Sequence, residues 1–73
     1  MSTLVISELL HERDAAADLK VSVAWLQKHR SRGTGPAFIR VGGRKGGAVR
    51  YRRSDLERWI EENRVVHAAS ARV

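Results

Sequence analysis

The sequence predicts a small, mainly helical domain that carries one β-hairpin. Two short helical segments are separated only by Lys20 and Val21. Two β-like segments follow on either side of a glycine-rich tip, and a helix-capping signal begins at Ser54. A chain of 73 residues accommodates one domain with a small core. We therefore expect residues 1–73 to form a single domain, with its folded core at about residues 11–62 and a tail at each end.

The first helix is predicted over Glu12–Leu19. Its alanines favour a helix and permit close packing, and its acidic residues crowd the first turn, where the helix dipole stabilises negative charge. His11 is placed to cap this helix. The eleven residues before the helix fit either a short strand or a first helical turn.

The second helix follows after the break at Lys20-Val21. Ser22 is a favourable N-cap residue, and the helix is expected to end near Ser31. Two short helices joined by a turn of a few residues are typical of a helix-turn-helix. The glycines and proline of residues 33–36 then stop helical structure.

Residues 37–41 and 48–52 read as the two strands of a hairpin, with residues 42–47 as its glycine-rich tip. The alternation predicts one face toward the core and the other toward solvent. The residues predicted to face the core are Ile39, Val41, Val49 and Tyr51. Those predicted to form a ladder of guanidinium groups on the opposite face are Arg40, Arg50 and Arg52.

The third helix is predicted to begin with a capping box in which Ser54 is the N-cap and Glu57 the reciprocal partner. Leu56, Trp59 and Ile60 form its apolar stripe, and Asn63 or Arg64 ends it. Trp25, on the second helix, is expected to pack in the core rather than to stack on a base, and His29 is expected to be structural. The last ten or so residues read as a tail.

The positive charge is concentrated in the middle of the chain. The formal net charge is +6, but the residues before position 28 and after position 53 are net acidic. The cations of the middle segment, which contains no acidic residue, are Lys28, Arg30, Arg32, Arg40, Arg44, Lys45, Arg50, Arg52 and Arg53. Cations without counter-charges repel one another, and a polyanion is the usual reason for such a segment. Nucleic acid is the predicted partner.

Taken together, the elements predict a winged helix-turn-helix that binds double-stranded DNA. The second helix would enter a major groove, and the hairpin would act as a wing on the backbone or an adjacent minor groove. The positions predicted to contact DNA on and after this helix are Val23, Ala24, Gln27, Lys28, Arg30, Ser31 and Arg32. Those on the wing are Arg40, Arg44, Lys45, Arg50 and Arg52.

Side-chain chemistry suggests a role for several of these positions. Gln27 can pair with two atoms of adenine, and Lys28 can donate to guanine. Val23 or Ala24 can touch a thymine methyl group. Ser31 and Arg32 are expected near phosphates. Arg44 and Lys45, at the wing tip, suit a narrow minor groove.

Other functional classes lack the residues they require. There is no cysteine, and His11, His29 and His67 have no metal-ligand spacing, so we expect no metal and no cofactor. The glycine-rich tip lacks the Gly-Lys-Ser/Thr ending and the helix of a nucleotide-binding loop. No candidate catalytic residues are present, so an enzyme is not expected. No apolar run is long enough to span a membrane, and we expect a cytoplasmic, DNA-associated protein.

Three stretches of the chain also resemble a known family. They are Asp14-Ala-Ala-Ala-Asp-Leu-Lys-Val-Ser22, Gly33-Thr-Gly-Pro-Ala-Phe-Ile-Arg-Val-Gly-Gly43 and Val49-Arg-Tyr-Arg-Arg-Ser-Asp-Leu-Glu-Arg-Trp-Ile60. They resemble the small winged-helix excisionases of phages (recombination directionality factors), within the MerR-like and AlpA-like superfamily. In this chain Lys20 takes the turn position that such proteins usually give to glycine, and the wing tip is longer.

The resemblance implies a protein that binds attachment-site DNA cooperatively, bends it and directs a phage integrase toward excision. The implied partners are double-stranded DNA, the integrase and further copies of the same chain. The alternative is a small transcriptional regulator that binds an operator, or a small subunit that targets a packaging enzyme to DNA. The absence of a heptad extension favours the excisionase. An RNA-binding module is less favoured, because the chain has only four aromatic residues and at least two of them are expected in the core, where they cannot stack on bases.

Overall fold

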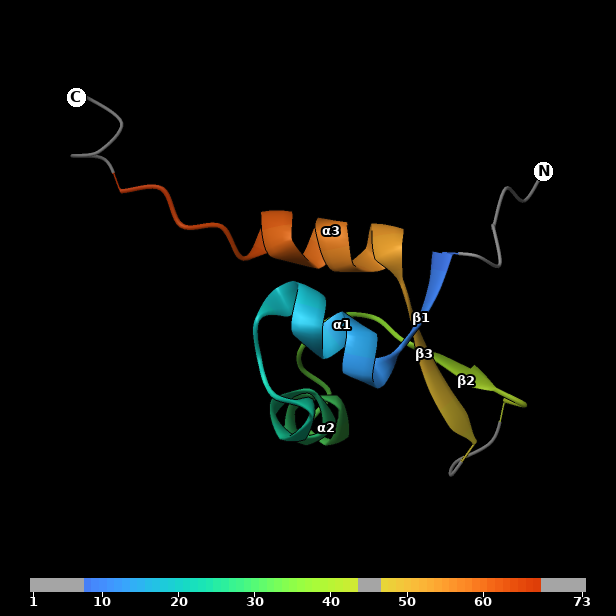
Figure 1. Cartoon of the computed structure of the whole chain (residues 1–73). Helices are drawn as coiled ribbons and strands as arrows, with labels where there is room; N and C mark the ends of the chain where they lie inside the picture. Colours follow the sequence, from blue (N-terminus) through green and yellow to red (C-terminus); the bar gives the residue numbers. More distant parts are fainter. Residues whose placement is uncertain (1–7, 44–46, 68–73) are drawn as a thin grey trace.

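The computed structural model describes residues 8–43 and 47–67, and within them it has three helices and a three-stranded antiparallel sheet. The elements in chain order are β1 (Leu9–His11), α1 (Glu12–Leu19), α2 (Val23–Ser31), β2 (Ile39–Val41), β3 (Ala48–Arg52) and α3 (Arg53–Glu62). Helix α1 lies between α2 and α3, and the sheet closes one side of this helical layer (Figure 1). The predicted winged helix-turn-helix is confirmed.

Of the segment before α1, which fits either a strand or a helical turn by sequence, the structure describes only the end, and there Leu9–His11 forms a strand. β1 pairs antiparallel with β3 and places Leu10 opposite Tyr51. The sheet order is therefore β1-β3-β2, with β3 in the centre. β3 is therefore paired with β1, before the first helix, as well as with β2, the other strand of the wing.

The register of the hairpin corrects the predicted arginine ladder. Arg40 pairs with Val49, and Ile39 pairs with Arg50. Directly opposed residues of an antiparallel pair project from the same face, so Arg40 lies on the face of Val49, and Ile39 on the face of Arg50. The prediction was wrong for β2, because each odd-numbered residue of β2 pairs with an even-numbered residue of β3. For β3 it is confirmed, since Tyr51 is buried and Val49 packs against the core. Val41, predicted to face the core, is 51% exposed.

The core is small and lies where α1, α2, α3 and β3 meet. Its fully buried residues are Ala15, Ala16, Leu26, Tyr51 and Leu56. The two alanines have no side chain beyond Cβ, which lets α1 approach its neighbours closely. Trp25 is partly buried against this cluster and meets Trp59 edge-on, with 5.9 Å between ring centroids, which confirms its predicted packing role.

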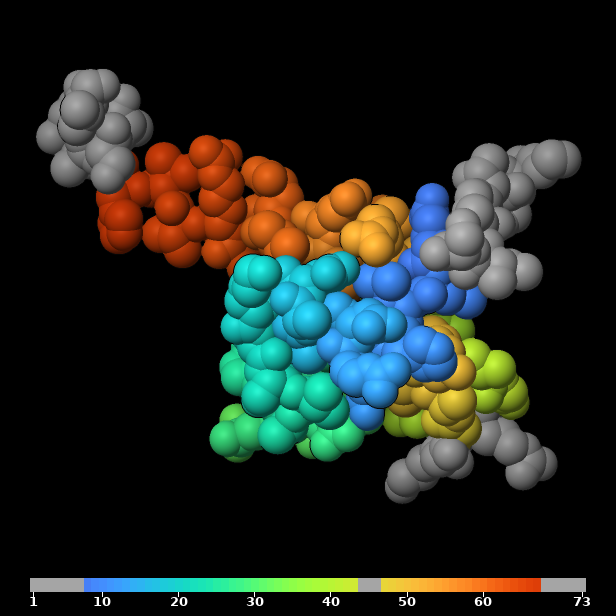
Figure 2. Space-filling model, in the orientation of Figure 1, coloured from blue at the N-terminus to red at the C-terminus, as the bar shows by residue number. Residues whose placement is uncertain are grey.

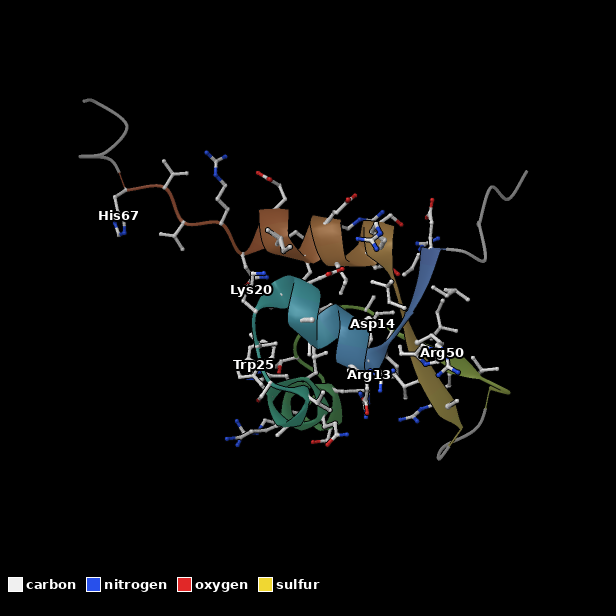
Figure 3. All side chains as sticks on the ribbon, viewed as in Figure 1. Arg13, Asp14, Lys20, Trp25, Arg50 and His67 are labelled. Carbon is white, nitrogen blue, oxygen red and sulfur yellow. The ribbon has the colours of Figure 1, made fainter. Side chains whose placement is uncertain are left out.

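The turn between α1 and α2 tolerates a side chain at an unusual backbone position. Lys20 has φ 61° and ψ 38°, the left-handed conformation that glycine adopts most easily. Its N–H donates to the Ala17 carbonyl at 3.2 Å, and the Val21 N–H donates to the Ala16 carbonyl at 3.0 Å. Ser22 Oγ then accepts the Trp25 N–H at 3.0 Å, which confirms the predicted cap of α2. Figure 3 shows Lys20 at this turn.

The predicted capping box of the third helix is wrong. α3 begins at Arg53, one residue before the expected cap, and Arg52 occupies the N-cap position without a side-chain cap. Since β3 runs directly into α3, Ser54 already lies inside the first turn of the helix and cannot be its N-cap. Arg52 Nη2 instead donates to Asp55 Oδ1 at 2.9 Å. His11 likewise occupies the N-cap position of α1 without a side-chain hydrogen bond.

The apolar stripe of α3 is only partly covered. Leu56 is buried and Trp59 half-buried, whereas Ile60 is 49% exposed. Asn63 forms the C-cap, close to the predicted end, and residues 64–67 extend away from the body of the domain (Figure 2). Among the described residues, no helix is long and apolar enough to cross a membrane.

Candidate nucleic-acid interface

Helix α2 itself contains no acidic residue, and its basic residues lie in its C-terminal half. The exposed residues among those predicted to contact DNA are Ala24, Gln27, Lys28, Ser31 and Arg32. They reach the surface because Leu26, on the opposite side of the helix, is anchored in the core. Val23 packs partly against the core, so less of its side chain is available to a base. These exposed residues include the hydrogen-bond donors and the small side chains that can contact base edges in a major groove.

Glu12 is the residue that ties the recognition helix to the start of α1. Gln27 Nε2 donates to Glu12 Oε2 at 2.9 Å, and Arg30 Nη1 donates to Glu12 Oε1 at 3.0 Å. Both oxygens of one carboxylate are thus engaged by neighbouring turns of α2. In this arrangement Gln27, the predicted adenine reader, has its amide held by a fixed partner.

The ionisation of Glu12 follows from these contacts. Partial burial raises the pKa of Glu12. The hydrogen bonds from Gln27 and Arg30 and the positive charge of Arg30 together lower it by more than burial raises it. The net result is a pKa below the ordinary value for glutamate. The carboxylate is therefore charged at neutral pH and neutralises Arg30.

Arg30 holds elements together as well as belonging to the basic surface. Its side chain is only 17% exposed, and Nη1 donates to the Tyr51 hydroxyl at 3.1 Å in addition to Glu12. Burial lowers the pKa of Arg30, whereas the hydrogen bonds to Tyr51 and Glu12 raise it more, so the guanidinium stays charged. Its guanidinium carbon also lies 5.7 Å from the Phe38 ring centroid. Arg30 thereby links α1, α2 and β3.

The wing arginines are in three different environments. Arg40 covers the Phe38 ring, with its guanidinium carbon 5.3 Å from the centroid. Arg50 Nη1 donates to the Val49 carbonyl at 2.9 Å, and Arg52 is paired with Asp55. All three are partly buried. Arg44 and Lys45, predicted for the wing tip, lie outside the described residues.

His29 has the structural role expected of it. Its Nδ1 is 2.7 Å from Thr34 Oγ1, and its ring lies 4.0 Å from the Trp25 ring, centroid to centroid. Gly35, with φ 85°, passes close beside it, and a Cβ there would lie 3.2 Å from the His29 Cβ. These contacts fix the loop that leaves α2 and leads into the wing.

Sequence reasoning missed two residues that hold this surface in place from within the fold, Glu12 and Tyr51. Glu12 reads as a favourable first-turn acid of α1, and its partners lie 15 and 18 residues further along the chain. Tyr51 was predicted to face the core, but nothing local in the sequence indicates that its hydroxyl accepts a hydrogen bond from Arg30. Only the packing of α1 against α2 and β3 brings these groups together.

A helix-turn-helix with a basic, acid-free second helix, followed by an arginine-bearing hairpin, defines a winged helix-turn-helix protein that binds double-stranded DNA. Residues 9–64 match the helix-turn-helix domain family. The chain belongs to this family, which is consistent with its fold and its surface. No curated protein and no solved structure matches it.

Proposed function

We propose that the protein is an excisionase-type DNA-binding factor that binds attachment-site DNA cooperatively, bends it and directs a phage integrase toward excision. The observation that carries the proposal is the short third helix. α3 has ten residues and ends at Glu62, and residues 63–67 continue without helix. In the described part of the chain nothing extends into a coiled coil. This favours assembly of copies along DNA over a stable two-fold dimer on one operator.

In this proposal α2 reads the bases and the wing positions the module. Gln27 and Lys28 contact base edges, and Ala24, with the accessible part of Val23, contacts thymine methyl groups. Ser31 and Arg32 bind phosphates. The wing tip, with Arg44 and Lys45, enters a minor groove that is narrowed as the DNA bends. The protein acts by binding and shaping DNA, without catalysis of its own.

Cooperation between copies follows from the size of the module. One reading helix and one wing cover about 600–1,000 Å² and bind modestly, so neighbouring copies must add contacts. Asp14, on α1, and Glu57 and Glu62, on α3, are exposed, and within the described residues they are in no ion pair. They are the surface we propose for the basic face of the next copy or for the integrase.

The test is a gel-shift series on DNA that carries one, two and three sites, followed by mobility measurements on circularly permuted fragments. Binding to the second and third site should be tighter than to the first, and mobility should change as the sites move along the fragment. Glu57→Gln combined with Glu62→Gln should reduce this cooperativity while leaving single-site binding intact. Independent filling of every site without bending would favour the alternative, a small transcriptional regulator on a single operator.

A further inference from the structure

A cationic hollow lies between the start of α1 and the wing. Its volume is about 460 Å³, and it opens to solvent. The residues that line it are His11, Glu12, Arg13, Arg30 and, from the wing side, residues 47–50. Two of the lining residues, Arg13 on α1 and Arg50 on β3, are labelled in Figure 3. Arg13 was not among the residues predicted to contact DNA.

The hollow has a net positive charge in its described lining, which suits the binding of an anion. Of the described residues that line it, Glu12 is the only acid, and both of its oxygens already accept hydrogen bonds from Gln27 and Arg30. Arg13 and Arg50, in contrast, are in no ion pair within the described part of the chain. After Glu12 and Arg30 neutralise each other, two guanidinium groups remain with their charge unbalanced.

The position of the hollow identifies the anion. It is lined by the last turn of the recognition helix, through Arg30, and by the base of the wing, through Arg50. When the helix occupies a major groove and the wing the adjacent minor groove, the sugar-phosphate strand that separates the two grooves must pass between them. That strand carries a phosphate for every nucleotide, and arginine binds phosphate through its planar fork of N–H donors.

We propose that this hollow binds the DNA backbone between the two grooves, with Arg13 and Arg50 donating to its phosphate oxygens from opposite sides. Arg13 adds a contact from α1 to those of α2 and the wing. The inference rests on the docking of helix and wing assumed in the proposed function. It is independent of base sequence, because only the backbone is contacted.

The experiment measures the salt dependence of binding to a mixed-sequence duplex just long enough for one copy. Each phosphate contact contributes about −0.9 to the slope of log K against log salt. For the wild type we expect a slope of about −4 to −7. Arg13→Gln should make the slope less negative by about 0.9 and weaken binding roughly eightfold at about 0.1 M salt, the fold-change that this slope gives. Arg50→Gln should act in the same direction.

Two further variants make the result specific. Arg58→Gln removes the same charge from an exposed position on α3, outside the hollow, and should leave the slope unchanged. Arg32→Gln removes a phosphate contact that the proposed docking already assumes. Arg13 is exposed, so Arg13→Gln should retain the thermal stability of the wild type, which circular dichroism checks.

Each outcome bears on the inference. If Arg32→Gln makes the slope less negative and Arg13→Gln does not, the hollow binds no phosphate, while the docking stands. If neither substitution makes the slope less negative, the docking itself is wrong, and the inference with it. If Arg13→Gln weakens binding only on longer duplexes that hold several copies, Arg13 contacts a neighbouring protein, which also overturns the assignment.

Discussion

Replacing Glu12 with glutamine tests the contact that joins the recognition helix to α1. Glu12→Gln keeps the shape of the side chain and removes its charge. Gln27 can still donate to the remaining carbonyl oxygen, but Arg30 loses its ionic partner. Since Arg30 is only 17% exposed, water replaces the lost partner incompletely. The free energy of unfolding should therefore fall.

The size of the loss lies between two reference values. Exposed ion pairs contribute about 0–1 kcal/mol, and hydrogen bonds to charged groups contribute about 1.5–3 kcal/mol. With side chains 17% and 28% exposed, the Arg30–Glu12 pair lies between these cases, and we expect about 1–2 kcal/mol. A domain of this size changes its Tm by about 4–8 °C per kcal/mol, so the Tm should fall by about 4–16 °C.

The loss should also depend on pH, because contacts in the folded state lower the pKa of Glu12. A carboxylate with a lowered folded pKa stabilises the fold above its unfolded pKa of about 4.3, and this contribution disappears as the pH falls through the folded value. The difference in Tm between wild type and Glu12→Gln should be full at about pH 7 and shrink below about pH 4.3.

Thermal unfolding followed by circular dichroism, from about pH 7 to about pH 3, measures both effects. The matched control is Glu61→Gln, which removes the same charge from an ion pair whose side chains are 72% and 66% exposed. It should leave the Tm nearly unchanged. An equal Tm for wild type and Glu12→Gln at neutral pH, or a difference that stays constant down to pH 3, would refute the reasoning.

Two other substitutions test the base contact of Gln27 and the backbone strain at Lys20. Gln27→Ala should reduce the preference for a cognate site by about 1–3 kcal/mol while leaving binding to mixed-sequence DNA nearly unchanged, as measured by competition gel shift. Equal losses on both duplexes would mean that Gln27 reads no base. Lys20→Gly should raise the free energy of unfolding by about 0.5–1 kcal/mol, because relief of the left-handed strain of about 1–2 kcal/mol exceeds the added entropy of the unfolded chain. A lower Tm for Lys20→Gly would contradict this.

The residues predicted to contact DNA fall into two groups: those whose exposure the sequence predicts correctly and those that the fold engages in internal contacts. Gln27, Lys28 and Arg32 are exposed where the helical period expects them. Arg30 and Arg52 carry the same charge in the sequence, yet each is engaged within the fold, by Glu12 and Tyr51 in one case and by Asp55 in the other. Charge alone does not distinguish an arginine that is available to DNA from one that holds two elements together.

The sequence by itself determined the helix-turn-helix, the hairpin and the basic middle segment. These features depend on neighbouring residues: the Ser22 cap, the glycines after α2, and the run of cations without acids. Local conformational preference and composition are readable without knowledge of the packing.

Only the tertiary structure decided the pairing of β1 with β3, the hairpin register that puts Arg40 on the core face, and the contact of Glu12 with Gln27 and Arg30. The register sets the face of every wing side chain, and a shift of one residue reverses it while the sequence stays the same. Glu12 acquires its partners because two alanines let α1 pack closely between its neighbours. Such contacts join residues far apart in the chain, and their geometry exists only once the core has formed.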